Sequence, residues 1–130
     1  MAALANYSEK LLLDFLMTSG SATRPTAWYV ALYTAAPNDA GGGTELSGDG
    51  YTRQAVTFAA ASSPAGTTSN TNVPSFTANG GSWGTITHLG IWDASSSGNF
   101  LWHGALSASK TVADGDTIDF AVGNIDLTLA

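Results

Sequence analysis

The sequence predicts an all-β fold: a single-domain, jelly-roll-like β-sandwich with one N-terminal α-helix. Short runs rich in β-branched and aromatic residues alternate with clusters of glycine, proline, serine and aspartate along most of the chain. A single stretch near the N-terminus has apolar residues at helical spacing. Several of the short runs are apolar on both faces, which is typical of strands that are covered on two sides.

The length and composition fit one domain over residues 1–130 that works within an assembly. At 130 residues, roughly 65–70% of the surface of the unfolded chain can be buried, so a substantial core can form. Charged residues make up 11% of the sequence, against about 25% in an average protein. So few charges indicate a subunit whose surface is partly covered by other proteins.

Charge, cysteine content and hydropathy argue against several classes of function. The net charge is −6 and the four basic residues, Lys10, Arg24, Arg53 and Lys110, are scattered, so no nucleic-acid partner is expected. The absence of cysteine excludes disulfides, thiolate nucleophiles and cysteine-ligated zinc. Neither a signal peptide nor a run of about 20 apolar residues is evident, so we expect a soluble protein with no membrane partner.

The helix is expected at 6–18. Asn6 can cap its first turn together with Glu9, and Gly20 can end it. Two interpretations of its apolar stripe stay open: the helix covers the β-structure of its own chain, or it packs on a neighbouring subunit. The stripe consists of Tyr7, Leu11, Leu12, Phe15 and Leu16.

Strands are expected at 27–34, 51–58 and 73–78, and long polar loops separate them. The first strand is apolar on both faces and therefore central. The third contains a proline, which favours an edge position. The segments 38–50 and 59–72 are rich in glycine, serine, threonine and asparagine, and they are expected to be flexible loops.

A hairpin over 82–106 is the expected centre of the fold. It comprises a strand at 84–92, a turn at 93–99 and a strand at 100–106, and it contains three of the four tryptophans. Leu89 and Ile91 are expected on one face, with Ile86 and Trp92 on the other. The predicted register places Trp92 opposite Asn99, His88 opposite His103 and Ile86 opposite Ala105.

The C-terminal region is expected to form a second hairpin. A short segment at 108–112 leads into a turn at 113–116, and a strand follows at 117–122. Gly123 and Asn124 suit a type II′ turn before a last strand at 125–129. In this register Val122 faces Ile125, Phe120 faces Leu127 and Ile118 faces Leu129. The alternative is one long strand with a bulge at Gly123.

The candidate sites for chemistry are weak. His88, His103 and Asp93 could form a metal corner, but a usable site needs three or four converging ligands, so a structural histidine pair is favoured. Asp114 and Asp116 could bind calcium, although turn formation explains both aspartates.

The remaining candidates also have structural explanations. The glycine triplet 41–43 lacks the Gly-Lys-Ser/Thr continuation of a phosphate loop. Arg53 either pairs with an acidic loop or contacts a partner subunit. The tryptophans Trp28, Trp92 and Trp102 could stack on sugars, but core packing is the default. We therefore expect no enzyme and no catalytic, cofactor-binding or metal-binding residue.

Several segments resemble a family of small virion proteins of tailed bacteriophages. The resembling segments include 51–58, 83–94, 98–106 and 110–117, and the opening helix, the strand after it and the closing 120–129 also fit. The most specific motif is Trp-Gly-Thr-Ile-Thr-His-x-Gly-Ile, which begins at Trp83; after it, Trp92 stands where the family more often has phenylalanine.

Members of this family are labelled as tail-fibre proteins or as capsid decoration (cement) proteins. The chain has no coiled-coil heptads and no fibrous repeat, which favours a cement protein. The resemblance then implies a virion protein made in the host cytoplasm and bound to the outer surface of the capsid. Its partners would be the major capsid protein and copies of itself in a homotrimer. The alternatives are a tail fibre or receptor-binding subunit and a carbohydrate-binding module.

Overall fold

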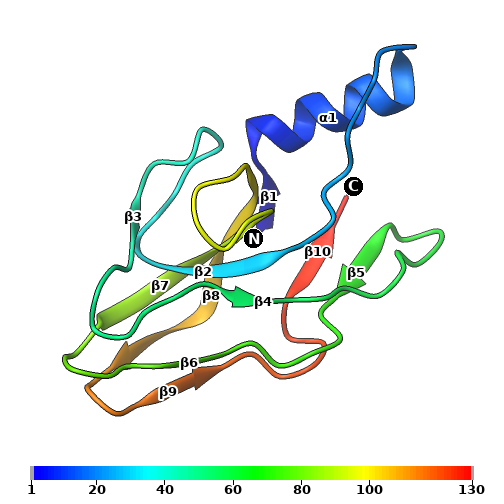
Figure 1. Ribbon diagram of the computed structural model, residues 1–130. Helices are drawn as coiled ribbons and strands as arrows, with labels where there is room; N and C mark the ends of the chain where they lie inside the picture. The colour runs from blue at the N-terminus through cyan, green and yellow to red at the C-terminus, as the bar shows by residue number, and fades with distance from the viewer. Residues whose placement is uncertain (1, 130) are drawn as a thin grey trace.

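The computed structural model describes residues 2–129 and is built around a twisted six-stranded antiparallel sheet (Figure 1). Its strands lie in the order β1 (Ala2–Leu4), β8 (Phe100–Val112), β7 (Gly84–Trp92), β2 (Tyr29–Ala35) and β3 (Thr44–Glu45), and β4 (Gln54–Ala55) also pairs with β2. Two smaller sheets join β5 (Thr67–Ser69) to β10 (Asp126–Thr128) and β6 (Ser75–Thr77) to β9 (Thr117–Asp119). With one helix, α1 (Asn6–Met17), the predicted all-β, sandwich-like fold is confirmed.

The main core lies between the six-stranded sheet and the two small sheets. β2 is central, as predicted, because Val30 and Leu32 enter this core while Ala31 and Tyr33 are buried on the opposite face. On that opposite face, Phe100 and the half-buried Trp92 complete a second, smaller cluster. The main core contains Val30, Leu32, Val56, Phe76, Ala78, Trp83, Ile86, Ile91, Leu101, Val112, Ile118, Ile125 and Leu127.

The central hairpin forms, but its predicted register is wrong. β7 covers the predicted 84–92, whereas β8 continues to Val112 instead of ending at 106. Trp92 pairs with Phe100 rather than Asn99, which shifts the register by one residue. An irregularity near Leu101 adds a second residue, so His103 lies opposite Gly90 rather than His88. The turn itself is held by Asp93, whose carboxylate accepts hydrogen bonds from the backbone N–H of Asn99 (2.7 Å) and from its side-chain amide (2.9 Å).

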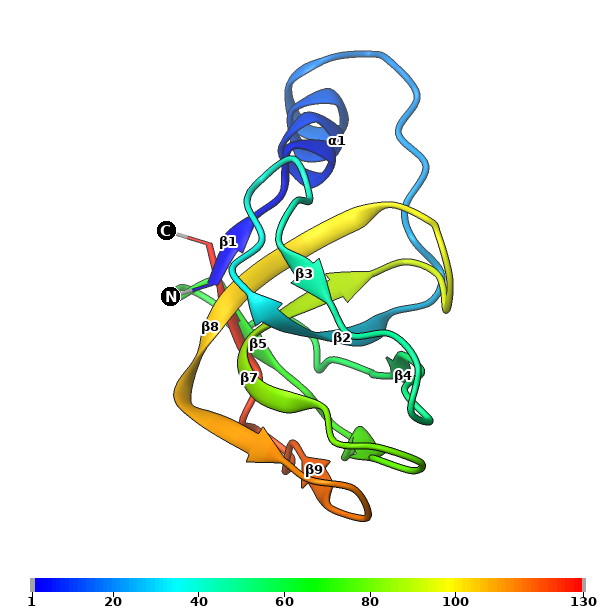
Figure 2. The same cartoon turned by 90° about the vertical axis from the view of Figure 1, so that its left-hand side faces the viewer.

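A second irregularity explains why Ile86 does not share a face with Trp92. Ile86 pairs with Lys110 and His88 with Ala105, so four β8 residues, 106–109, stand opposite the single residue Thr87. Such an insertion bends the strand and increases its local twist, and β8 is visibly curved in Figure 2. Ile86 is thereby turned into the main core.

The predicted C-terminal hairpin does not form, and neither does the alternative single strand. β9 pairs with β6 and β10 with β5, so the two strands lie in different small sheets. The buried Asn70 accounts for this separation. Its side chain accepts a hydrogen bond from the backbone N–H of Ile125 (2.8 Å) and donates to the carbonyl oxygens of Phe120 (3.3 Å) and Ala121 (3.0 Å). These bonds hold the segment between β9 and β10 as a loop.

The two predicted loops each contain a short strand. β3 lies within 38–50 and β5 within 59–72, while the predicted strand 51–58 is reduced to β4 and a single bridge between Phe58 and Asn70. β1 was not predicted. Threonine-rich segments fit a pleated surface when a partner strand is available, and those partners come from distant parts of the sequence.

Helix α1 begins and ends close to its predicted limits, for different reasons. The capping position is Ala5 rather than Asn6, and no side chain caps it. At the other end Thr18 is extended, and its hydroxyl donates to the carbonyl oxygen of Asp14 (2.8 Å), so Thr18 rather than Gly20 ends the helix. Within residues 2–129, no helix has the length and apolar character that crossing a membrane requires.

Candidate interaction surface

Helix α1 lies at one end of the molecule, where only its first half is covered by the sandwich (Figures 1 and 2). Ser8 is buried, and Leu11 and Leu12 are half-buried. The second half leaves four apolar side chains in solvent. Their exposed fractions are 62% for Leu13, 70% for Phe15, 68% for Leu16 and 75% for Met17. The expectation that α1 covers its own chain therefore holds for the first half only.

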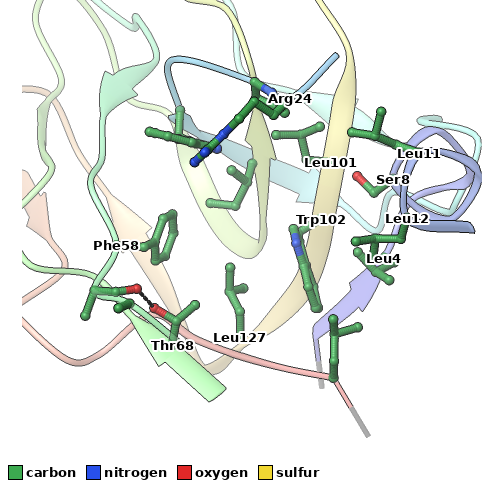
Figure 3. Close-up of a pocket in the computed structure, with 16 residues that line it drawn as sticks. Leu4, Ser8, Leu11, Leu12, Arg24, Phe58, Thr68, Leu101, Trp102 and Leu127 are labelled. Carbon is green, nitrogen blue, oxygen red and sulfur yellow. Dashed lines mark hydrogen bonds between the residues drawn. The ribbon is translucent and has the colours of Figure 1, made fainter. Parts of the chain in front are cut away.

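A groove of about 470 Å³ lies between the covered half of α1 and the sandwich (Figure 3). Leu11 and Leu12 form its helical wall, and Trp102, Leu127 and Phe58 project into it from the strands and the adjoining chain. Its lining is mainly apolar. The remaining side chains around it are Leu4, Ser8, Arg24, Pro25, Trp28, Ala59, Ala60, Thr68, Ile91, Leu101 and Leu129.

The chemistry of this groove suits the binding of an apolar surface. Arg24, which is exposed, is the one charged residue in the described lining. Thr68 contributes a hydroxyl, but that hydroxyl already donates to the carbonyl oxygen of Ala59 (2.5 Å). Burying apolar side chains in the groove would stabilise a complex by removing them from water, and Arg24 could pair with a carboxylate at the rim.

A second cluster surrounds Arg53. Its guanidinium donates to both carboxylate oxygens of Glu45 (2.8 and 2.9 Å) and to the carbonyl oxygens of Ala94 (3.0 Å) and Ser97 (2.9 Å). It also lies 4.0 Å from the centre of the Trp92 ring, within the range of a cation–π interaction. The predicted pairing of Arg53 with an acidic loop is confirmed, since Glu45 comes from 38–50.

Two tyrosines complete this cluster. The hydroxyl of Tyr51 donates to Glu45 (2.8 Å) and accepts from the backbone N–H of Leu32 (3.1 Å), and the hydroxyl of Tyr33 accepts from the Trp92 indole (3.0 Å). Burial raises the pKa of both tyrosines above the ordinary value, and the Glu45 charge adds to this.

The carboxylate of Glu45 also determines the direction in which the pKa of Arg53 shifts. Burial works to lower the pKa of Arg53, but the hydrogen bonds and charge of Glu45 outweigh it and leave that pKa raised. Each charged or polar group in the cluster is therefore matched by a partner within the chain. The arrangement joins the turn 93–99 to β3 and to the residue that precedes β4.

Neither the metal corner nor the favoured pairing of His88 opposite His103 is assembled, because His88 lies opposite Ala105 and His103 lies opposite Gly90. His103 Nε2 lies 2.7 Å from Asp39 Oδ1, whereas His88 Nδ1 lies 2.8 Å from the hydroxyl of Thr87, and Asp93 is used by its turn. Within residues 2–129, no three histidine, aspartate or glutamate residues gather closely enough to hold a metal ion.

The aspartates considered for calcium and the glycines considered for phosphate instead hold turns and contacts between loops. Asp116 accepts from the backbone N–H of Ala113 (3.0 Å), and Asp114 accepts from the N–H of Gly80 (2.9 Å). The triplet 41–43 adopts positive φ throughout and reverses the chain into β3. A Cβ atom at Gly43 would lie 2.7 Å from the carbonyl oxygen of Ala35, so this turn requires glycine there.

The tryptophans proposed for sugar binding are partly covered. Arg53 lies over Trp92, and Trp28 and Trp102 line the groove. Sequence reasoning left open that the stripe of α1 packs on a neighbouring subunit, but it did not include Leu13 and Met17 or locate the uncovered end of the helix, although a signal was present. The segment 11–17 reads Leu-Leu-Leu-Asp-Phe-Leu-Met and is apolar nearly all round, which is typical of a helix covered on every side.

Comparison with known proteins identifies the family. A search of curated proteins found no match. The family model described as podophage GP4 fiber I protein gp80 matches residues 3–128, which is nearly the entire chain. The chain therefore belongs to the podophage GP4 fiber I protein gp80 family and is a structural protein of a tailed-phage virion.

Proposed function

We propose that this chain is a subunit of a fibre on the tail of a phage particle. The match of residues 3–128 to a fibre-protein family carries this proposal, because it includes α1, the six-stranded sheet and the C-terminal strands together. The match thus concerns the whole domain rather than one shared motif.

Within a fibre, the chain would serve as a globular module at an end or a junction. A fibre shaft is built from heptads or from short repeats, and the 130 residues contain neither. The end of α1 and the groove beside it supply an apolar contact surface. The partners would be copies of the same chain, in a homotrimer, and a neighbouring virion protein. We propose no enzymatic activity.

Capsid decoration is the second candidate, and the short, weakly charged, non-fibrous chain favours it. A cement protein binds the assembled shell and not its separated subunits. It would stabilise each site by about 2.7 kcal/mol at a hundredfold excess over Kd. Many sites act together, so a modest local affinity would strengthen the shell against internal DNA pressure.

Electron microscopy of purified particles separates the two candidates. An antibody against this chain, carrying a gold label, is expected to mark the tail. Label distributed over the head would contradict the fibre proposal and support decoration.

A thermal comparison provides an independent test. Particles with and without the protein are heated side by side, and the DNA that they retain is measured. The fibre proposal predicts equal retention together with weaker adsorption of the depleted particles to host cells. Loss of DNA from depleted particles alone would support the cement role instead.

A further inference from the structure

Two complementary apolar features lie at the same end of the molecule. The first, called the knob here, consists of Leu13, Phe15, Leu16 and Met17 on the second half of α1. The second, called the flank groove, is the cavity beside the first half of α1. The knob exposes on the order of 500 Å² of apolar surface, near the upper end for the largest patch on a typical monomer.

We propose that the knob of one copy of this chain binds in the flank groove of a second copy. The inference rests on the proposal that the chain works as an oligomer, and it names the surfaces that join the copies.

The dimensions of the two features agree. An apolar cavity of about 150 Å³ holds a benzene ring. The flank groove, at about 470 Å³, therefore has room for the ring of Phe15 together with the side chain of Leu16. Both side chains are largely exposed, so they can enter a neighbouring groove without leaving the core of their own chain.

The charges also agree. Asp14 lies within the knob segment, and Arg24 lies on the lining of the flank groove, so the two features carry charges of opposite sign. Asp14 is paired with Lys10 one turn earlier on α1. Exposed pairs of this kind contribute little stability, and Asp14 can exchange Lys10 for Arg24 of a second copy.

A second copy explains both features with one contact. Every copy carries one knob and one groove in equal number, and a two-fold pair or a closed ring covers all of them. Any other partner would have to supply a groove for the knob and an apolar insert for the groove. A second copy of the same chain supplies both a groove and an apolar insert.

The test is sedimentation equilibrium of the purified protein. Wild type is expected to form a discrete oligomer. The double variant Phe15→Ser/Leu16→Ser should raise the dissociation constant about a hundredfold or more, because two apolar side chains lose their buried positions. Ala60→Trp, which fills the groove from an exposed position, should weaken association in the same way. Val122→Ser is the matched control: its side chain is 60% exposed elsewhere, and association should not change.

Mixing and charge reversal then identify the contact. An equimolar mixture of the Phe15→Ser/Leu16→Ser variant and Ala60→Trp should form a heterodimer, because one partner keeps its knob and the other its groove. Asp14→Arg and Arg24→Asp should each weaken association, and the combination should restore it. Circular dichroism melting of each variant checks that it remains folded.

Three results would overturn the inference. They are a monomeric wild type at high concentration, unchanged association of the folded knob variant, and failure of the mixture to associate. A monomeric wild type that still labels the phage tail would leave the fibre proposal standing, whereas an oligomer that labels the head would leave the self-contact standing. The two proposals can therefore fail separately.

Discussion

The Arg53 cluster and helix α1 with its flank groove both lie against the six-stranded sheet, but they differ in how far their side chains are satisfied within the chain. Around Arg53, a cation, a carboxylate, two tyrosine hydroxyls and an indole satisfy one another within the chain. At α1, four large apolar side chains remain in solvent beside an apolar groove. The first region is complete in the monomer, and the second requires another surface.

This difference shows where the sequence, which is poor in charged residues, leaves apolar surface uncovered. Within residues 2–129, every buried side-chain nitrogen or oxygen atom has a hydrogen-bond partner. The polar groups are thus used for the fold, while the excess of apolar surface collects at the end of α1. Four predictions sharpen the contrast, from the largest expected effect to the smallest.

Removing Arg53 should cost most. Arg53→Ala leaves Glu45 without its ion pair, frees two carbonyl oxygens of the turn 93–99 and uncovers Trp92. Removing one partner of a buried ion pair costs about 3–5 kcal/mol. Because Glu45 is partly exposed, we expect a cost of about 3 kcal/mol here. Urea unfolding of the variant measures the loss. The matched change Arg24→Ala should stay within about 0.5 kcal/mol, and equal costs for the two would contradict the contrast.

Two half-buried tryptophans should respond differently. Trp92→Ala removes the contacts with Phe100 and Arg53 and the hydrogen bond to Tyr33, but the ring is only half-buried, so we expect a loss of about 2–3 kcal/mol in the free energy of unfolding. Trp102→Ala widens the open groove and should cost about 1–2 kcal/mol in the monomer. Denaturant unfolding at low protein concentration compares them. A larger cost for Trp102→Ala than for Trp92→Ala would show that the flank groove is closed to solvent in the monomer.

Alkaline pH should weaken the Arg53 cluster selectively. Because the pKa of Tyr51 and Tyr33 is raised on folding, the stability that depends on their neutral form is present below about pH 10, where unfolded tyrosine titrates. It is lost as the pH rises from there toward the higher folded pKa. Urea midpoints should therefore fall above about pH 10, and less steeply in Tyr51→Phe. Parallel curves for the two proteins would count against this assignment.

Changes in the knob should have almost no effect on the monomer. Phe15 is largely exposed, so Phe15→Ser should alter the free energy of unfolding by less than about 0.5 kcal/mol when it is measured well below the association range. At high concentration, wild type should melt at a higher temperature than the variant because association stabilises it. A destabilised monomer would instead mean that Phe15 belongs to the core of its own chain.

The parts of the fold that depend on local patterns could be predicted from sequence. The alternation and turn signals around 84–92 and the apolar spacing at 6–18 gave these elements nearly to the residue. The failures involve distant partners. Nothing near Gly123 indicates that Asn70 would hold the following segment away from a hairpin. The register of His103 similarly depends on an irregularity that no local motif announces.

The candidate site shows the same division. The apolar residues of α1 were recognised, but whether a sheet covers them depends on where the helix sits relative to that sheet. Phe15 belongs to the same stripe as Leu11, yet Phe15 is 70% exposed whereas Leu11 is half-buried. Sequence periodicity identifies such a stripe and says nothing about where its cover ends.

Oxidation of Met17 tests most directly whether the end of α1 is covered in the assembled protein. Met17 is 75% exposed in the monomer, and dilute peroxide converts accessible methionine to its sulfoxide. The rate is followed by peptide mass spectrometry over a range of protein concentrations, with added free methionine as the internal reference. The account predicts fast oxidation in dilute protein and strong protection once the protein associates. Equal rates at all concentrations, in protein that sedimentation shows to be associated, would contradict it.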